Sequence, residues 1–181
     1  MTAQADATIS RDFGIPSAAE LTASVLADMV GAGDAKAARL VVVGHLSAAK
    51  ARAVAGLERD FLASPRAARH LVEAQSRLTD ALVETAFAAA TKLHPTPNPT
   101  EAERIAVLGV GGYGRAEMAP HSDVDLLFLT PWKITPWAES VIETMLYILW
   151  DLKLKVGHSS RTVKDCLRLG REDITIRTAL L

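Results

Sequence analysis

Two aspartates separated by one residue, Asp123 and Asp125, are the side chains of this sequence best suited to chemistry. Apolar residues alternate with them, which predicts a β-strand. Alternate residues of a strand point to the same face, so both carboxylates project together while Val124 and Leu126 turn into the core. Two adjacent negative charges destabilise a fold unless a cation lies between them. The expected cation is Mg²⁺, which prefers hard oxygen ligands such as carboxylates and phosphates.

Three glycines, Gly111, Gly112 and Gly114, come shortly before the aspartates. Glycine adopts backbone angles closed to other residues, and its N–H can approach an anion without a β-carbon in the way. The segment predicts a phosphate seat, beside which Arg115 and Ser122 add a cation and a hydroxyl. Each motif alone is more typical of a tight turn or a capped loop. Together they favour a metal-dependent site for nucleotidyl transfer, in which metal ions clamp the attacking and leaving oxygens.

Two other phosphate-binding patterns do not fit. Gly109, Gly111 and Gly114 match the spacing of a dinucleotide-binding turn, which needs a helix of about three turns and an acidic residue about 20 positions later. Only residues 115–122 separate this turn from the aspartates, and Pro120 interrupts them. A Walker-type loop also fails, because the sequence has no Gly-Lys-Ser or Gly-Lys-Thr.

The elements that position these residues change character at residues 94–99, where prolines at alternate positions favour an extended connector. We expect a helical region over residues 1–95 and a site-bearing core over residues 96–181. Hydrophobic runs after the connector predict two buried strands and a third, shorter one; these are Ile105–Val110, Val124–Leu129 and Lys153–Val156. Helices are expected from Thr135-Pro136 to about Asp151 and over Thr162–Leu181.

Before the connector, helices are predicted from their caps. Ser17 and Glu20, three residues apart, form a capping box, and Asp34 caps the next helix. A third helix is expected from Ser64, with a proline in its first turn, to about Leu93. Apolar residues recur along it at steps of three and four and predict one packing face: Leu71, Ala74, Leu78, Leu82, Ala86, Ala89 and Leu93.

Composition bounds the function. A formal net charge of −1 in 181 residues gives no basic field to gather polymeric nucleic acid. The lone cysteine, Cys166, rules out an internal disulfide or a cysteine metal cluster. Met1–Ala7 does not resemble a leader, and the nearest apolar run, Leu40–Val43, is far below the roughly 18 residues that span a membrane. We therefore expect a cytoplasmic protein with no membrane role. The chain stops on apolar residues without a helix cap, which suggests a piece of something longer.

The segments Gly111–Arg115 and Ser122–Leu127 resemble the signature of the polymerase-beta-like nucleotidyltransferase superfamily. Together with Leu149–Lys153 and Val156–Thr162, their order is similar to that of the bacterial PII protein uridylyltransferase (uridylyl-removing enzyme) family. The resemblance covers about the last 80 residues, while the helical first half carries little signature of its own.

The resemblance implies an α+β fold, in which an N-terminal helical segment precedes a small mixed sheet flanked by helices. It also implies transfer of UMP from UTP to a tyrosine hydroxyl of the PII nitrogen-signalling protein, with pyrophosphate released. Carried over to this sequence, the catalytic residues are Asp123 and Asp125, which bind the metal, and Arg115, which stabilises charge on pyrophosphate. The nucleotide-binding residues are Gly111, Gly112, Gly114, Arg115 and Ser122.

This chain departs from the family pattern in two ways. It lacks the His-Asp doublet of the family's hydrolase domain and ends before the domains that sense glutamine, so UMP removal and glutamine control are expected to be absent. Many superfamily members also use a third carboxylate on a later strand, where this sequence has Gly157 and His158. The substitutes to consider are Asp151, Asp165, Asp173 or an acid beyond Leu181.

Several alternatives stay open at this stage. His158 is either a nucleotide contact or a packed residue, and Lys155 and Arg161 are either triphosphate partners or solvated charges. For the function, the alternatives are a noncatalytic nucleotide-binding or interaction module, and a nucleotidyltransferase with another nucleotide or acceptor.

Overall fold

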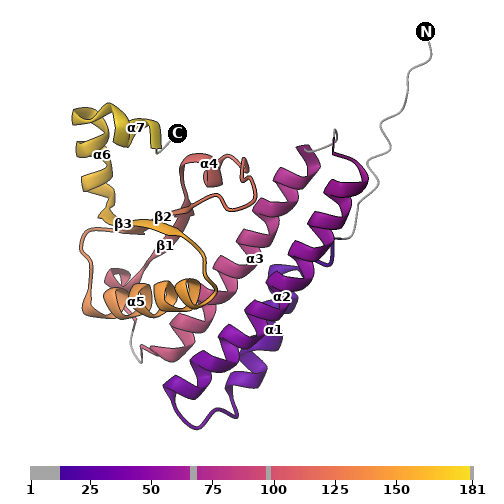
Figure 1. Ribbon diagram of the computed structural model, residues 1–181. Coiled ribbons are helices and arrows are strands. Elements are labelled where there is room, and N and C mark those ends of the chain that lie inside the picture. Colours follow the sequence, from indigo (N-terminus) through magenta and orange to yellow (C-terminus); the bar gives the residue numbers. More distant parts are fainter. Residues whose placement is uncertain (1–12, 66–68, 97–98, 180–181) are drawn as a thin grey trace.

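The computed structural model of the chain describes residues 13–179 apart from 66–68 and 97–98. Helices come first, and a three-stranded sheet with further helices follows (Figure 1). The expected α+β fold with a small mixed sheet is confirmed. The longer elements are α1 (Ala18–Met29), α2 (Ala35–Ala63), α3 (Arg69–Leu93), β1 (Ala106–Gly109), β2 (Val124–Thr130), α5 (Pro136–Asp151), β3 (Val156–Thr162) and α6 (Val163–Glu172). The short ones are η1 (Glu101–Glu103), α4 (Gly111–Gly114) and α7 (Ile174–Ala179).

Side-chain caps begin the helices at the predicted residues, although the predicted capping box at Ser17 is only half formed, because Glu20 accepts from the Ser17 hydroxyl and not from its backbone N–H. Ser17 accepts a hydrogen bond from the N–H of Glu20, and its hydroxyl donates to the Glu20 carboxylate over 2.8 Å. Asp34 accepts from the N–H of Ala37 over 2.7 Å and so begins α2. Thr135 caps α5, with Pro136 in the first turn, where its missing N–H costs nothing.

The third helix differs from the prediction at its start. The described part of α3 begins at Arg69, and Ser64 ends α2 instead, because its N–H donates to the carbonyl of Asp60 over 2.9 Å. A serine followed by a proline fits either role, since proline is also common just after a helix ends. The expected packing face is present: Ala74, Leu78, Leu82, Ala86 and Ala89 are buried, and Leu71 and Leu93 pack against the core.

The sheet has the order β1-β2-β3, with β1 antiparallel and β3 parallel to β2. The central strand, β2, is buried as expected. The prediction that β1 is buried is wrong: it is paired on one side only and is mostly exposed. The third strand was also misplaced, since β3 begins at Val156, where the predicted strand ends. Its composition, Gly-His-Ser-Ser-Arg-Thr, is too polar for an apolar run to mark it.

The predicted C-terminal helix forms as two helices, α6 and α7, with a break at Asp173. Thr162 caps α6, and its hydroxyl and N–H donate to the carboxylate of Asp165. These hydrogen bonds lower the pKa of Asp165. The end of the predicted range, residues 180–181, lies outside the described residues, as does the expected absence of a leader at residues 1–7.

One helix, α2, is long and apolar enough by length and composition to cross a membrane, which the short run Leu40–Val43 did not suggest. This helix also meets the description of a core helix, because Val42, Leu46 and Ala49 are fully buried and it packs against α1 and α3.

The core is continuous across the proline connector. It joins residues of α1–α3 to Phe128 of β2 and to Met145 and Leu149 of α5.

Candidate functional site

The predicted phosphate seat is a single turn of helix, α4, that follows β1 directly. Gly111, its first residue, has a φ of 60°, which disfavours any residue with a side chain. The turn folds back on the strand so closely that a Cβ on Gly114 would lie 2.6 Å from the carbonyl oxygen of Gly109. No three-turn helix follows, which agrees with the rejection of a dinucleotide fold. The first N–H groups of a helix have no acceptor within it, so this turn presents donors.

The carboxylate of Asp125 lies between this turn and β3. One oxygen, Oδ2, is 3.5 Å from where a Cβ on Gly111 would be, and a Cβ on Gly157 would overlap the other, Oδ1. Asp125 is paired with Gly157 in the parallel register of β2 and β3, and its carbonyl accepts from the N–H of Val110, just before the turn. The predicted proximity of aspartate and glycines is therefore present in the structure. Within the described residues, no ion pair or side-chain hydrogen bond neutralises the Asp125 carboxylate.

The other predicted site residues surround Asp125 less closely. Asp123 is exposed and directly precedes β2, and the alternation of buried Val124 and Leu126 with partly exposed Asp125 agrees with a strand that turns its acids away from the core. Ser122 is partly exposed, and its N–H donates to Ala119.

Arg115 forms its ion pair with Glu117 and not with Asp123 or Asp125 in this structure. Its Nε donates to Glu117 over 2.9 Å at the surface. Exposed pairs of this kind contribute about 0–1 kcal/mol, so a bound triphosphate can compete with Glu117 for the guanidinium. Its predicted role stays a prediction.

The structure places His158 on the side of the sheet away from the acids, with its side chain exposed, so its role stays a prediction. Successive strand residues face opposite sides, so His158 lies on the face opposite Gly157 and Asp125. There its ring contacts Trp150 of α5, with centroids 6.3 Å apart. Arg161 shares the face of Gly157 but lies four residues along β3, about 13 Å at the rise of a strand. Lys155 is exposed just before β3, and its carbonyl accepts from the N–H of Val124.

The three acids considered as a third metal ligand have other partners. Asp151 lies 3.6 Å from Nε of Arg39, Asp165 accepts from the hydroxyl and N–H of Thr162 in the capping box of α6, and Asp173 accepts from the N–H groups that begin α7. Across the described ranges, no group of three His, Cys, Asp or Glu side chains is placed to hold a metal ion. The donors that fit Mg²⁺ here are the two hard carboxylates at the start of β2.

Sequence reasoning missed the anchor of the glycine turn. Tyr113, in the middle of α4, is buried, and its hydroxyl donates to Asp80 of α3 over 2.8 Å. Burial, and then the Asp80 carboxylate, raise the pKa of Tyr113 above its usual range, so the hydroxyl stays a donor. The only signal in the sequence is a tyrosine among glycines, which does not identify a partner 33 residues away.

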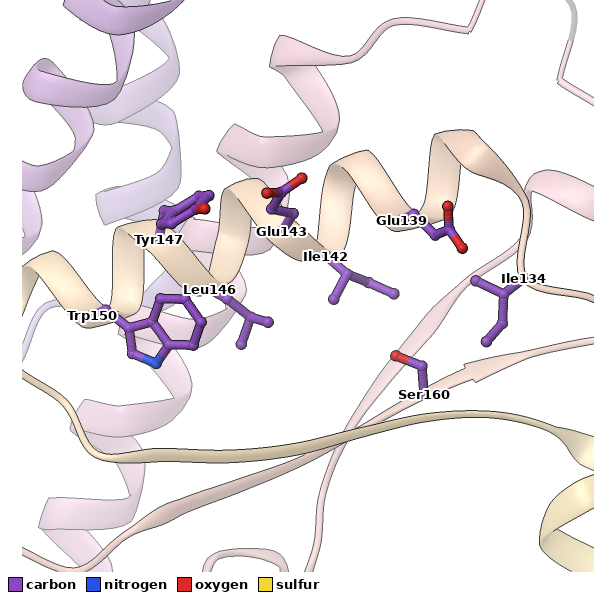
Figure 2. Close-up of a pocket in the computed structure, with 8 residues that line it drawn as sticks. All are labelled: Ile134, Glu139, Ile142, Glu143, Leu146, Tyr147, Trp150 and Ser160. Atoms are coloured by element: carbon purple, nitrogen blue, oxygen red, sulfur yellow. The ribbon is translucent and has the colours of Figure 1, made fainter.

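A separate groove of about 350 Å³ lies between α5 and β3. Figure 2 shows Ile142, Leu146 and Trp150 pointing from α5 toward Ser160 of β3, with Glu139 and Glu143 at the rim. Ser160 is paired with buried Phe128 and so faces away from Asp125. This groove is thus on the opposite side of the sheet from the acids and the glycine turn.

Comparison with known proteins places this geometry in a family. Residues 19–155 match the model of the glutamate-ammonia ligase adenylyltransferase family. The chain belongs to that family. The match runs from α1 to the residue before β3, so this nucleotidyltransferase family includes the helical region as well as the glycine turn and Asp125.

Three curated relatives are 55–70% identical to this chain over the residues that align, and each carries the name bifunctional uridylyltransferase/uridylyl-removing enzyme. The protein of Cereibacter sphaeroides is 70% identical over 164 residues, which are 89% of this chain and 18% of the relative. That of Ruegeria pomeroyi is 62% identical over 83% of this chain and 17% of the relative. That of Erythrobacter litoralis is 55% identical over 69% of this chain and 14% of the relative.

The predicted resemblance to uridylyltransferases is therefore confirmed. The chain spans less than a fifth of the length of these relatives. No solved structure matches it significantly.

Proposed function

We propose that this chain carries the nucleotide site of a cytoplasmic enzyme that transfers UMP from UTP to a tyrosine of the PII signalling protein. The observation that carries the proposal is the Asp125 carboxylate, held 3.5 Å from the Cβ position of Gly111 at the start of the glycine turn. The names of the relatives support uridylyl transfer. Polymeric nucleic acid and membrane lipid are not proposed as substrates.

In the proposed reaction the phenolic oxygen of the acceptor bonds to the α-phosphorus of UTP. The bond to the bridging oxygen breaks, and pyrophosphate and the phenolic proton leave. The N–H groups of Gly111 and Gly112 hold phosphate oxygens, as donors at a helix start do. Asp123 and Asp125 would hold Mg²⁺, which neutralises phosphate charge when it is bound. Arg115 exchanges Glu117 for the departing pyrophosphate, so most of the catalysis is positioning and charge stabilisation.

The test is UMP transfer from labelled UTP to purified PII by the protein and by Asp123→Asn and Asp125→Asn. Each change should reduce transfer by about 10²–10³-fold, the range for removing one preorganised electrostatic group. Because both acids lie outside the core, the melting temperature should stay close to that of the original protein. Glu73→Gln, the same loss of charge on the exposed part of α3, is the matched control and should leave transfer unchanged. Full activity in either aspartate variant refutes the metal site.

Two observations favour specific alternatives. The family model is described as an adenylyltransferase, so UTP, ATP and CTP should be compared as donors; preference for ATP would replace uridylyl with adenylyl transfer. The lack of a third acid in the described part of the chain favours a noncatalytic nucleotide-binding module. Calorimetry with UTP and Mg²⁺ separates the noncatalytic module from the enzyme, since UTP binding without transfer of UMP to PII supports the module.

A further inference from the structure

The glycine turn needs an anchor because glycine holds a backbone conformation poorly. Each glycine loses more conformational freedom on folding than any other residue, and three of the four residues of α4 are glycines. A phosphate seat must nevertheless be held to within about 1 Å, since misplacement on that scale can cost about 10²-fold in rate. The structure must therefore supply the rigidity from outside the glycines.

Tyr113 is the side chain that supplies it. Only 8% of Tyr113 is exposed, and its ring lies against the end of β1, where a Cβ on Gly109 would be 2.9 Å from the ring. Among the described side chains of residues 111–117, it is the one that hydrogen-bonds to another element. The bond reaches Asp80, which lies on α3 before the proline connector.

The core fixes the backbone of α3 at Asp80, although the Asp80 side chain itself is exposed. The residues on either side of it along α3, Leu78, Ala81 and Leu82, are buried with at most 2% exposure. The aspartate thus extends from a fixed helix toward the turn. Glu84, one turn further along α3, also raises the pKa of Tyr113 through its negative charge. The hydrogen bond to Asp80 therefore ties the tyrosine hydroxyl to a helix whose backbone is fixed.

We propose that Asp80 is a positioning residue, which holds the glycine turn in its phosphate-binding conformation through the hydroxyl of Tyr113. The consequence for binding rests on the proposed function, that of a nucleotide site at this turn. The helical region then has a part in nucleotide binding although none of its described residues belongs to the site.

The test compares Asp80→Ala and Tyr113→Phe with the original protein in two measurements. Amide hydrogen exchange at residues 109–115, without nucleotide, should be faster in both variants. The affinity for UTP with Mg²⁺, measured by calorimetry, should fall about fivefold to tenfold, the factor that one lost hydrogen bond gives. The double variant should be no weaker than either single one, because both changes remove the same bond. Glu73→Ala, on the same helix, is the control and should change neither quantity.

A conservative variant separates positioning from general stability. Asp80→Asn keeps an oxygen acceptor at the same place, so its exchange rate at the turn and its affinity for UTP should lie within about twofold of those of the original protein. A general loss of buried structure would instead lower the melting temperature of all the variants alike. Unchanged exchange at the turn in Asp80→Ala and Tyr113→Phe overturns the anchor. Failure of the original protein to bind any triphosphate overturns the proposed function instead, and the exchange rates still decide the anchor.

Discussion

At the scale of single residues, the site depends on the absence of a side chain at position 157. Gly157 lies beside Asp125 in the sheet, and a Cβ there would overlap Oδ1 of the carboxylate. The conflict is with the side chain, so an alanine would push the carboxylate away and leave the strand in place. Glycine at this position lets the acid remain between the turn and β3.

We therefore predict that the Gly157→Ala variant folds as the original protein does but loses most of its UMP transfer activity. UMP transfer should fall by about a hundredfold, because Asp125, the proposed metal ligand, shifts by roughly 1 Å. The melting temperature should hardly change, since Gly157 is exposed on an edge strand. Transfer assays and thermal denaturation of the same preparation check this.

A glycine with space around it provides the comparison. Gly31 has no atom within 4 Å of an added Cβ, so Gly31→Ala should leave transfer at the original level. If Gly157→Ala transfers UMP as fast as Gly31→Ala does, the position of Asp125 is not what the reaction needs.

Local spacing predicts part of the site. Asp125 and Gly111 are close in sequence and joined by one short passage, so their proximity follows from a strand, a turn and a returning strand. Gly157 and Asp80 come to the site through sheet register and helix packing, which no spacing in the sequence reveals. The direction of His158 also depends on register, because a shift by one residue reverses every side chain of a strand.

At the scale of elements, α2 contains two glycines, Gly44 and Gly56, that differ in the space around them. A Cβ on Gly44 would meet nothing within 4 Å, whereas one on Gly56 would overlap the carbonyl oxygen of Phe13. Phe13 lies just before α1 and is buried, so the N-terminal segment crosses α2 at Gly56. Gly56 permits this crossing, whereas Gly44 only weakens the helix.

Alanine at these two positions should change stability in opposite directions. Gly44→Ala should raise the free energy of unfolding by about 0.5–1 kcal/mol through helix propensity. Gly56→Ala should lower it by about 1–3 kcal/mol, the usual cost of overpacking. Urea denaturation followed by circular dichroism measures both. A shift in the same direction for the two variants contradicts the crossing of Phe13 over α2.

Elements with strong local signals were predicted with their bounds, and the others were not. The cap at Thr135 and the apolar side of α5 set that helix, and the continuous apolar run set β2. β3 is polar because it lies at an edge, so its pairing to β2 stabilises it without an apolar pattern. The start of α3 was wrong because Ser64 and Pro65 suit the end of one helix as well as the start of the next.

At the scale of the whole molecule, the core does not stop at the proline connector that the sequence suggests as a boundary. α5 packs against α3, and Met118, which follows the glycine turn, belongs to the same core as Leu78 of α3. The helical region therefore forms one wall of the core of the site-bearing region. It also holds the glycine turn through Asp80, so the two regions depend on each other both for stability and for the shape of the site.

This dependence predicts that residues 96–181 do not fold alone. Without α3, α5 would lose the helix that it packs against, and a piece of this size has little other apolar surface to bury. Urea denaturation of the fragment should show no cooperative transition under conditions where the protein shows one. Addition of residues 13–95 as a separate chain should restore the transition, because the wall of the core returns with it. A cooperative transition in the fragment alone would mean that the connector separates two independent domains and that α3 is dispensable for the sheet.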